Sequence, residues 1–301
     1  MDVIAFGGVF LEIVFGHMPS PPRPGEEVYA DEFAISCGGA VTAAGAASRM
    51  GVHAGLCTVL GTDLGSRVAQ EYCRRAGVDL STSRHVTGPA AGITVVLNYD
   101  DDRAFITHRP PHPAPERAEP ERWLEALRQQ RPSWCYVHPG PGMSRLIREA
   151  RSLGIRVALD VGLDSISSDP AGVLDCVRLA DVFLPNTDEL LRLTQADSLA
   201  AAIDTASSWG TPVVVKRGPS GAVVADRAGR TEVTEGIRAV HVRDRTGAGD
   251  AFAGALIGAL CQGASMAEAA AAGNAAGSET VGKLGAVGQV EMEGLGGILL
   301  R

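Results

Sequence analysis

Short runs of hydrophobic residues are separated by longer stretches in which hydrophobic and polar positions mix. Runs of this length, rich in valine, isoleucine and leucine, predict buried strands. They are Val3 to Gly8, Leu56 to Leu60, Cys135 to His138, Val157 to Val161, Val182 to Leu184 and Val213 to Lys216. Helical stretches alternate with these runs, and four of them end at a glycine, as expected for left-handed C-caps: Gly51, Gly77, Gly154 and Gly210.

This alternation predicts an α/β fold with a mostly parallel sheet covered by helices on both faces. In such folds ligands bind beyond the carboxyl ends of the strands. Two stretches interrupt the alternation, Glu26 to Cys37 and Ala91 to Thr107, and the second contains a turn signal from Asn98 to Arg103. We expect them to form a small antiparallel sheet that projects from the core, although two separate hairpins remain an alternative.

A proline-rich segment, residues 109–120, cannot continue a helix or a central strand and predicts a loop. His108 and His112 lie in and beside it. Because no third ligand is in view, we expect solvent exposure rather than a metal site.

Residues 244–263, DRTGAGDAFAGALIGALCQG, carry the most informative pattern. The turn Gly247-Ala248-Gly249 runs straight into apolar residues, so it should open a buried helix whose first N–H groups bind an anion such as phosphate. Asp250 stands at the mouth of this site, where a carboxylate can accept a proton from an attacking hydroxyl. Taken alone, the residues also allow a helix cap and a tight turn with no chemistry.

The DRTGAGD motif resembles the DTxGAGD signature of the ribokinase-like (PfkB) carbohydrate kinases, with Arg245 in place of the usual Thr or Ser. The resemblance implies that Asp250 is the catalytic base and that the amides of Gly247, Ala248 and Gly249 form an anion hole. It also implies a monovalent cation, such as K⁺, at the carbonyl groups of Asp244 and Thr246.

On the acceptor side, the segment around Gly38 and Gly39 resembles the family's GGxxxN motif, which implies contact between these glycines and the sugar. Ala43 stands where the family has an Asn that bonds the acceptor, and Glu12 stands where it has an Asp that holds two sugar hydroxyls. Glu can accept the same hydrogen bonds from one methylene further out. These departures predict a changed acceptor or pose; for Glu12 the alternative is the exposed start of a lid strand.

On the nucleotide side, Asn186 to Glu189 follows a predicted strand and has the composition of a helix N-cap. It resembles the family's NxxE motif. The resemblance implies that Asn186 reaches the nucleotide phosphates and that Glu189 organises the Mg²⁺ shell through water.

Lys216 ends a predicted strand, and the following Gly218 and Gly221 resemble the family's KxGxxG turn near the nucleotide. Asn274 lies where the family often has an Asn near the adenine. The loop Gly282 to Gly288 should close the nucleotide pocket and supply carbonyl groups to the monovalent cation.

Other polar residues have structural explanations. Asp63 is placed to cap a helix that begins near Leu64. His53 and His138 are single histidines beside strands, and we interpret both as structural. Asp160 and Asp164 follow the end of a strand and can face the phosphate region, but they do not match the family pattern well.

Composition narrows the range of partners. A formal charge of −8 and a pI near 5.4, with interspersed charges, argue against nucleic acid and anionic lipid. The uncharged run 251–267 is interpreted as a buried helix rather than a membrane span, and the acidic N-terminus does not resemble a secretory signal. The scattered cysteines predict reduced core thiols in a cytoplasmic protein; they are Cys37, Cys57, Cys73, Cys135, Cys176 and Cys261.

The resemblance extends from residue 3 to about 288 and implies one ribokinase-like domain over residues 1–301, with a lid formed by parts of 12–37 and 91–108. The expected activity is transfer of the ATP γ-phosphate to a hydroxyl of a sugar, sugar derivative or nucleoside, with Mg²⁺ and a homodimer formed through the lid. The main alternative is a family member that binds such ligands without turnover. A dinucleotide oxidoreductase lacks its GxGxxG after the first strand, and a P-loop kinase lacks its GxxxxGK[ST].

Overall fold

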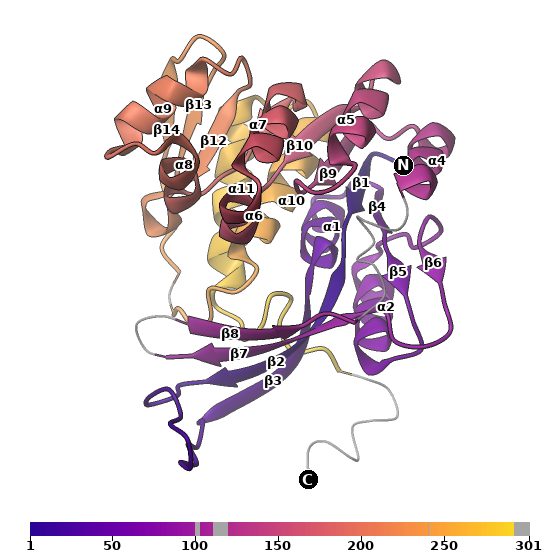
Figure 1. Ribbon diagram of the computed structural model, residues 1–301, viewed down its shortest axis with the longest axis vertical. Helices are drawn as coiled ribbons and strands as arrows, with labels where there is room; N and C mark the ends of the chain where they lie inside the picture. Colours follow the sequence, from indigo (N-terminus) through magenta and orange to yellow (C-terminus); the bar gives the residue numbers. More distant parts are fainter. Residues whose placement is uncertain (100–102, 111–119, 240, 292–301) are drawn as a thin grey trace.

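The protein, in a computed structural model, consists of a large sheet covered by helices and a smaller sheet that projects from one end (Figure 1). The structure describes residues 1–99, 103–110, 120–239 and 241–291. The predicted loop around His112 therefore lies mostly outside the described residues, as does the middle of the turn predicted from Asn98 to Arg103.

The large sheet has eight strands in the order β14-β13-β12-β11-β10-β9-β1-β4. The six strands from β12 to β4 are parallel to one another, and β13 and β14 are antiparallel additions at one edge. Their bounds are β1 Val3–Phe6, β4 Ala54–Cys57, β9 Trp134–Val137, β10 Arg156–Leu159, β11 Val182–Phe183, β12 Val213–Lys216, β13 Ala222–Ala225 and β14 Thr231–Thr234. The predicted α/β class with a mostly parallel sheet is thus confirmed.

One strand prediction was wrong in detail. The run Leu56 to Leu60 divides into the end of β4 and a separate strand, β5 (Val59–Leu60), which pairs with β6 (Arg84–His85). Both pieces are largely buried, so hydrophobicity alone does not mark the break between them. Sequence analysis also did not predict β13 and β14.

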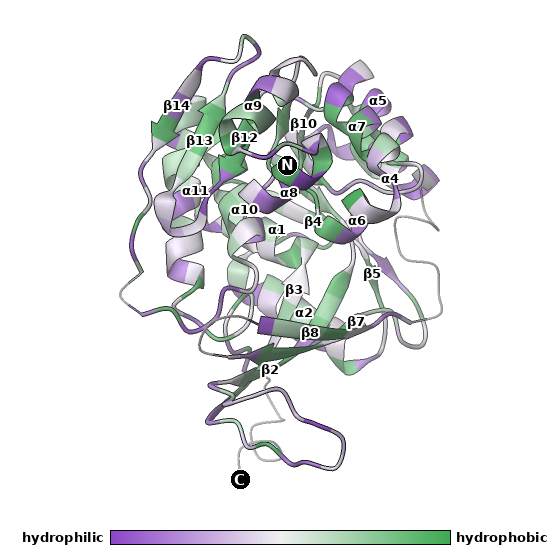
Figure 2. Ribbon diagram, turned by 60° about the vertical axis from the view of Figure 1, so that its left-hand side comes forward, coloured by the Kyte–Doolittle hydropathy of each residue, from purple (hydrophilic) through white to green (hydrophobic). Residues whose placement is uncertain are grey.

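Helices cover both faces of the large sheet because side chains alternate along its buried strands. One face, which includes Val3, Ala5 and Tyr136, packs against α1, α2, α10 and α11; the other, which includes Ile4 and Phe6, packs against α4 to α9. Figure 2 shows hydrophobic strands β12 and β13 between helices whose outer surfaces are more hydrophilic. The helices are α1 Ala40–Arg49, α2 Leu64–Ala76, α4 Pro120–Gln130, α5 Met143–Ser152, α6 Leu163–Ser168, α7 Pro170–Leu179, α8 Thr187–Thr194, α9 Leu199–Ser207, α10 Ala248–Cys261 and α11 Met266–Thr280.

The small sheet has the strand order β3-β2-β7-β8. Its strands are β2 Val9–Gly16, β3 Glu32–Gly39, β7 Gly92–Asn98 and β8 Arg103–His108. The sheet is mixed rather than antiparallel as predicted: β2 and β7 are parallel, because the chain runs through α1, β4 and α2 before it returns to the sheet. Residues 26–31 were predicted as strand but lie outside it, and β3 instead continues to Gly39.

The predicted caps at four glycines and at Asp63 are confirmed. Gly51, Gly77, Gly154 and Gly210 all have positive φ angles between 69° and 82°, and Asp63 caps α2 by accepting from the backbone N–H of Ser66.

The uncharged run 251–267 contains two helices rather than one, because α10 ends at its Gln262 cap and α11 begins at residue 266. All six cysteines are free. Among the described residues, no helix is both long enough and apolar enough to cross a bilayer.

Candidate active site

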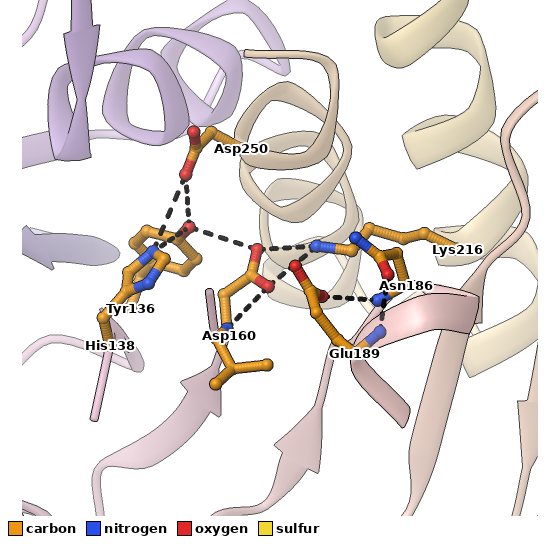
Figure 3. A network of polar contacts seen from close by, with 8 residues as sticks. Tyr136, His138, Asp160, Asn186, Glu189, Lys216 and Asp250 are labelled. Atoms are coloured by element: carbon orange, nitrogen blue, oxygen red, sulfur yellow. Dashed lines mark hydrogen bonds and ion pairs between the residues drawn. The ribbon is translucent and has the colours of Figure 1, made fainter. Parts of the chain in front are cut away.

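Polar side chains gather where strands of the large sheet end beneath the start of α10 (Figure 3). Tyr136 belongs to β9 and His138 follows it, Asp160 follows β10, and Lys216 ends β12. Asp250 reaches them from the first turn of α10. In a parallel sheet the carboxyl ends of the strands share one edge, so residues distant in sequence meet there.

The predicted glycine turn does lead into a buried helix. Gly247 is the N-cap residue of α10 with φ 74°, a conformation that favours glycine, and a Cβ at this position would overlap Ala286. Residues 247–249 are half-buried, and the Ala248 N–H donates to the Arg245 carbonyl at 3.4 Å. A Cβ built on Gly249 would lie 3.3 Å from the Lys216 ammonium, so a positive charge stands beside the turn.

Asp250 is held by hydrogen bonds at one of its two oxygens. Its Oδ1 accepts a hydrogen bond of 2.6 Å from the Tyr136 hydroxyl and lies 3.7 Å from Nε2 of His138. The Asp250 side chain keeps 26% of its surface exposed. Burial acts to raise the pKa of this carboxyl, but the nearby His138 and its charge, together with the Tyr136 hydrogen bond and the charge of Lys216, outweigh it and hold the pKa below its ordinary value. Asp250 is therefore an ionised carboxylate that solvent can reach.

Lys216 and Asp160 form a close, buried ion pair. The Lys216 ammonium donates to both oxygens of Asp160, at 2.7 and 2.8 Å, and the side chains are only 12% and 3% exposed. Burial acts to lower the pKa of Lys216, yet the charges of Asp160 and Glu189 raise it above its ordinary value. Lys216 thus stays cationic beside the glycine turn.

His138, Asp160 and Asp250 have donor atoms within 4.8 Å of one another, a spacing that suits a metal ion. The donor set does not fit one, because both Asp160 oxygens already bind the Lys216 ammonium and Asp250 accepts from Tyr136. His138, which the sequence led us to interpret as structural, lies in the Asp250 network through its contact with Tyr136. Asp164, in contrast, is exposed on α6.

Asn186 and Glu189 open α8 as a reciprocal capping box. The Asn186 side chain accepts from the Glu189 N–H at 2.9 Å, and Glu189 Oε2 accepts from the Asn186 N–H at 2.7 Å. Burial, aided by the nearby Asp160 charge, raises the pKa of Glu189 to about 7, although Lys216 opposes this. A buried carboxylate of this kind fits a nearby hydrated divalent cation, whose charge would favour its ionised form.

On the nucleotide side, Asn274 in α11 holds the end of β14. Its amide donates to the Glu235 carbonyl at 3.0 Å and to the Thr234 carbonyl at 3.4 Å. Gly221 packs against the same segment, where a Cβ would overlap the Thr234 carbonyl oxygen, and Gly218 is exposed with φ 54°. Gly221 and Asn274 therefore contact the same segment at the end of β14, and contact of Gly218, Gly221 and Asn274 with a nucleotide stays a prediction.

The Asp244 carboxylate joins the start of the glycine motif to the loop at 282–288. Its Oδ1 accepts from the backbone and the hydroxyl of Thr246, at 2.8 and 2.6 Å, and its Oδ2 accepts from the Gly285 N–H at 2.8 Å. The side chain of Asp244 is thus satisfied within the protein. A monovalent cation at this turn would bind the backbone carbonyl groups, as the sequence predicts.

Glu12 lies in the middle of β2 and is only 5% exposed. Its Oε2 accepts from the Ala286 N–H at 2.8 Å, in the loop that also contacts Gly247. Burial, opposed by the Ala286 hydrogen bond, raises the pKa of Glu12 to about 7. A Cβ at Gly38 would overlap Oε1 of Glu12, so the glycine makes room for this carboxyl. Glu12 is therefore not the exposed start of a strand.

The remaining acceptor-side residues lie at the start of α1. Gly39 is its N-cap with φ 86°, and a Cβ there would overlap the Gly8 carbonyl oxygen. Ala43 is buried, and its own carbonyl packs tightly against Gly254 of α10. Its methyl group cannot replace the hydrogen bonds of an asparagine at this position.

Sequence analysis missed Tyr136, whose hydroxyl lies at the centre of the network. It is fully buried and lies within hydrogen-bond distance of His138, Asp160 and Asp250. A signal existed, because Tyr136 and His138 are two residues apart and so point to the same face at the end of a predicted strand. What the sequence does not show is that α10 covers this face.

Comparison with known proteins agrees with this geometry. Among curated proteins, the chain is 26% identical over 238 residues to a cytidine kinase of Thermococcus kodakarensis, covering 77% of this chain and 82% of that protein. It is 27% identical over 288 residues to a ribokinase of Haemophilus influenzae, covering 90% of each chain. The Arabidopsis thaliana ribokinase solved with ribose and ATP has a TM-score of 0.77 at 23% identity, over 95% of this chain and 94% of that one. Finally, the family model for pfkB carbohydrate kinases matches residues 13–292, which places the chain in that family.

Proposed function

We propose that this carbohydrate kinase transfers the γ-phosphate of ATP to a hydroxyl of a sugar, sugar derivative or nucleoside, with Asp250 as the general base. The observation that carries the proposal is the Asp250 carboxylate itself. It is ionised, partly exposed, and set on the first turn of α10 directly after the glycine turn. A base in this position takes the hydroxyl proton as the oxygen attacks phosphorus.

Stabilisation of the transferred phosphoryl group falls to the backbone and to Lys216. The N–H groups of Gly247, Ala248 and Gly249 lie at the helix start, where the helix dipole favours negative charge, and the Ala248 N–H makes a long hydrogen bond of 3.4 Å to the Arg245 carbonyl. Lys216 places its ammonium group, which is paired with Asp160, beside Gly249. These groups are in place before the reaction, so little reorganisation is needed.

The proposal includes Mg²⁺ held through water by Glu189, while Asn186 reaches the nucleotide phosphates. When bound, Mg²⁺ supplies positive charge that offsets the charge of the phosphates. Gly218, Gly221 and Asn274 form the nucleotide wall.

A K⁺ ion would bind the carbonyl groups of Asp244 and Thr246. The tight turn that their side chains form, together with the adjacent 282–288 loop, supports this part of the proposal.

For the acceptor, we propose that it binds between the small sheet and α10, near Glu12, Gly38, Gly39 and Ala43. The buried Glu12 carboxyl is already tied to Ala286, which supports a pose different from that of a relative with Asp at this position. The small sheet would act as a lid within a single domain of residues 1–301, and its edge strands β3 and β8 offer a dimer contact. We also propose a cytoplasmic location.

An ATP-consumption assay over ribose, cytidine, adenosine, ribose 1-phosphate and hexoses tests the proposal. We expect turnover with at least one acceptor, and a loss of at least about 100-fold in Asp250→Asn, the lower range for a general base. Undiminished turnover in Asp250→Asn would refute the assignment of the base. Acceptor binding with a non-hydrolysable ATP analogue, seen as a raised melting temperature but without turnover, would identify a ligand-binding protein instead.

A further inference from the structure

A chain of hydrogen bonds connects Asp250 to a histidine that solvent can reach. The Tyr136 hydroxyl lies 2.6 Å from Asp250 Oδ1 and 2.8 Å from His138 Nε2 (Figure 3). Tyr136 is fully buried, whereas the His138 side chain is 40% exposed. The proposed transfer reaction does not itself require either residue, so the continuous path from the base to solvent needs its own explanation.

We propose that Tyr136 and His138 form a proton relay that carries the proton from Asp250 to solvent after phosphoryl transfer. The inference rests on the proposed role of Asp250 as the base. A carboxylate that has taken a proton must lose it before the next turnover. Bound acceptor and a closed lid would restrict direct access of water to Asp250, whose side chain is 26% exposed, whereas the His138 side chain at the end of β9 is 40% exposed.

The proton balance is simple. When the acceptor oxygen bonds to phosphorus, the bond between phosphorus and the ADP oxygen breaks and the hydroxyl proton moves to Asp250. The Tyr136 hydroxyl, which donates to Asp250 Oδ1 before the reaction, turns its proton toward Nε2 of His138; Asp250 then gives a proton to the Tyr136 oxygen while the proton of Tyr136 passes to Nε2 of neutral His138. Tyrosine remains neutral, the imidazole becomes imidazolium, and its Nδ1 proton leaves to solvent. One proton is released for each phosphate transferred.

Charges around the relay favour this direction of transfer. His138 faces Asp250 from α10, Asp160 from the end of β10, Lys216 from β12, and Tyr136 from its own strand. Burial and Lys216 lower the pKa of His138, but its close contact with the Asp250 carboxylate and the charges of Asp160 and Asp250 raise it overall. The pKa of Asp250 is lowered. A proton therefore moves downhill from Asp250 to neutral His138.

The relay predicts a specific pH dependence. Only neutral His138 can accept the proton, so kcat should rise with pH through the pKa of His138 and then level off. In His138→Gln the part of this rise that belongs to His138 should disappear, leaving any part that belongs to Glu189, whose pKa is raised to about 7. The kcat should fall by about 10- to 100-fold, less than the loss of the base itself, because slow direct release remains. His53→Gln is the matched control: it also removes a partly exposed, carboxylate-paired histidine, and it should preserve the wild-type profile.

Tyr136→Phe removes the central hydroxyl, and the double variant Tyr136→Phe/His138→Gln tests whether the two residues act as one unit. We expect the double variant to lose no more turnover than either single variant. Additive losses, or a wild-type pH profile in His138→Gln, would overturn the relay. Melting temperatures with and without a non-hydrolysable ATP analogue establish that each variant is folded and binds nucleotide.

A second measurement needs no acceptor. The Cε1 proton of His138, followed by NMR across pH, should titrate above the ordinary histidine range in wild type and shift down in Asp250→Asn. The same pKa of His138 in wild type and in Asp250→Asn would show that His138 and Asp250 are not coupled and would overturn the proposal. The two proposals fail differently: an active Asp250→Asn removes the base assignment, whereas an inactive Asp250→Asn with wild-type-like Tyr136→Phe and His138→Gln removes only the relay.

Discussion

Replacing Glu12 with Gln should make the protein more stable at alkaline pH. The folded state holds the Glu12 carboxyl at a pKa of about 7, mainly through burial, against an ordinary value of 4.5. The folded protein therefore binds this proton more tightly than the unfolded chain does. Below pH 4.5 the Glu12 carboxyl is protonated in the folded and the unfolded state, so it does not lower the free energy of unfolding. Between about pH 4.5 and 7 the free energy of unfolding falls, and above pH 7 the loss levels off.

The size of the effect follows from the two pKa values, since a tenfold change in proton affinity corresponds to about 1.4 kcal/mol. The full loss is about 3 kcal/mol. Gln is close to Glu in size, can still accept from the Ala286 N–H, and does not ionise. The difference in unfolding free energy between Glu12→Gln and wild type should grow by roughly 2 to 3 kcal/mol from pH 5 to pH 8.

Urea unfolding at pH 5, 6, 7 and 8 measures this difference. Glu26→Gln, at an exposed position, is the control and should show no comparable growth. A difference for Glu12→Gln that stays constant over this pH range would refute the reasoning, because it would mean that the folded protein does not hold the Glu12 proton more tightly. In the ATP-consumption assay, we expect the same variant to raise the KM for the acceptor more than the KM for ATP.

Three further substitutions test the nucleotide side. Asn186→Ala should lower the free energy of unfolding in urea by about 1 kcal/mol and also weaken binding of an ATP analogue. Ser265→Ala is the control: it removes the capping box of α11, so it should lower stability by a similar amount and leave nucleotide binding unchanged. Gly247→Ala should lower the melting temperature more than Gly263→Ala and abolish turnover, because both glycines have positive φ but only Gly247 lies against Ala286. Lys216→Met should cost about 3 to 5 kcal/mol in urea unfolding, since its buried carboxylate partner is left unpaired.

The sequence predicted the large sheet well because buried parallel strands are continuous hydrophobic runs. The bounds of β12 match the prediction, and the glycine caps have the expected backbone angles. The small sheet was harder to predict. Its strands mix buried and exposed positions, and the parallel pairing of β2 with β7 joins segments far apart in the chain. Neither strand composition nor local turn chemistry specifies that pairing.

At the site, too, local features were predicted from the sequence and contacts between distant residues were not. The glycine turn and the Asn186 cap are local features, so contiguous residues predicted the backbone conformation of each. The contact between Tyr136 and Asp250 joins residues 114 positions apart and depends on strand order and on which helix covers the end of β9. A single sequence contains neither, which is why His138 was interpreted as a structural residue.

The ion pair between Lys216 and Asp160 explains how the Lys216 ammonium stays charged beside the glycine turn without bound phosphate. A buried ammonium alone would lose its proton or destabilise the fold, because burial favours the neutral form. Asp160 offsets that cost and fixes the ammonium beside Gly249 through two short hydrogen bonds. In the proposed reaction the ammonium would therefore not have to move when phosphate binds, which is the condition under which electrostatic stabilisation is most effective. Asp160 acts by placing Lys216, just as Tyr136 acts by holding Asp250, and both anchors come from the ends of buried strands.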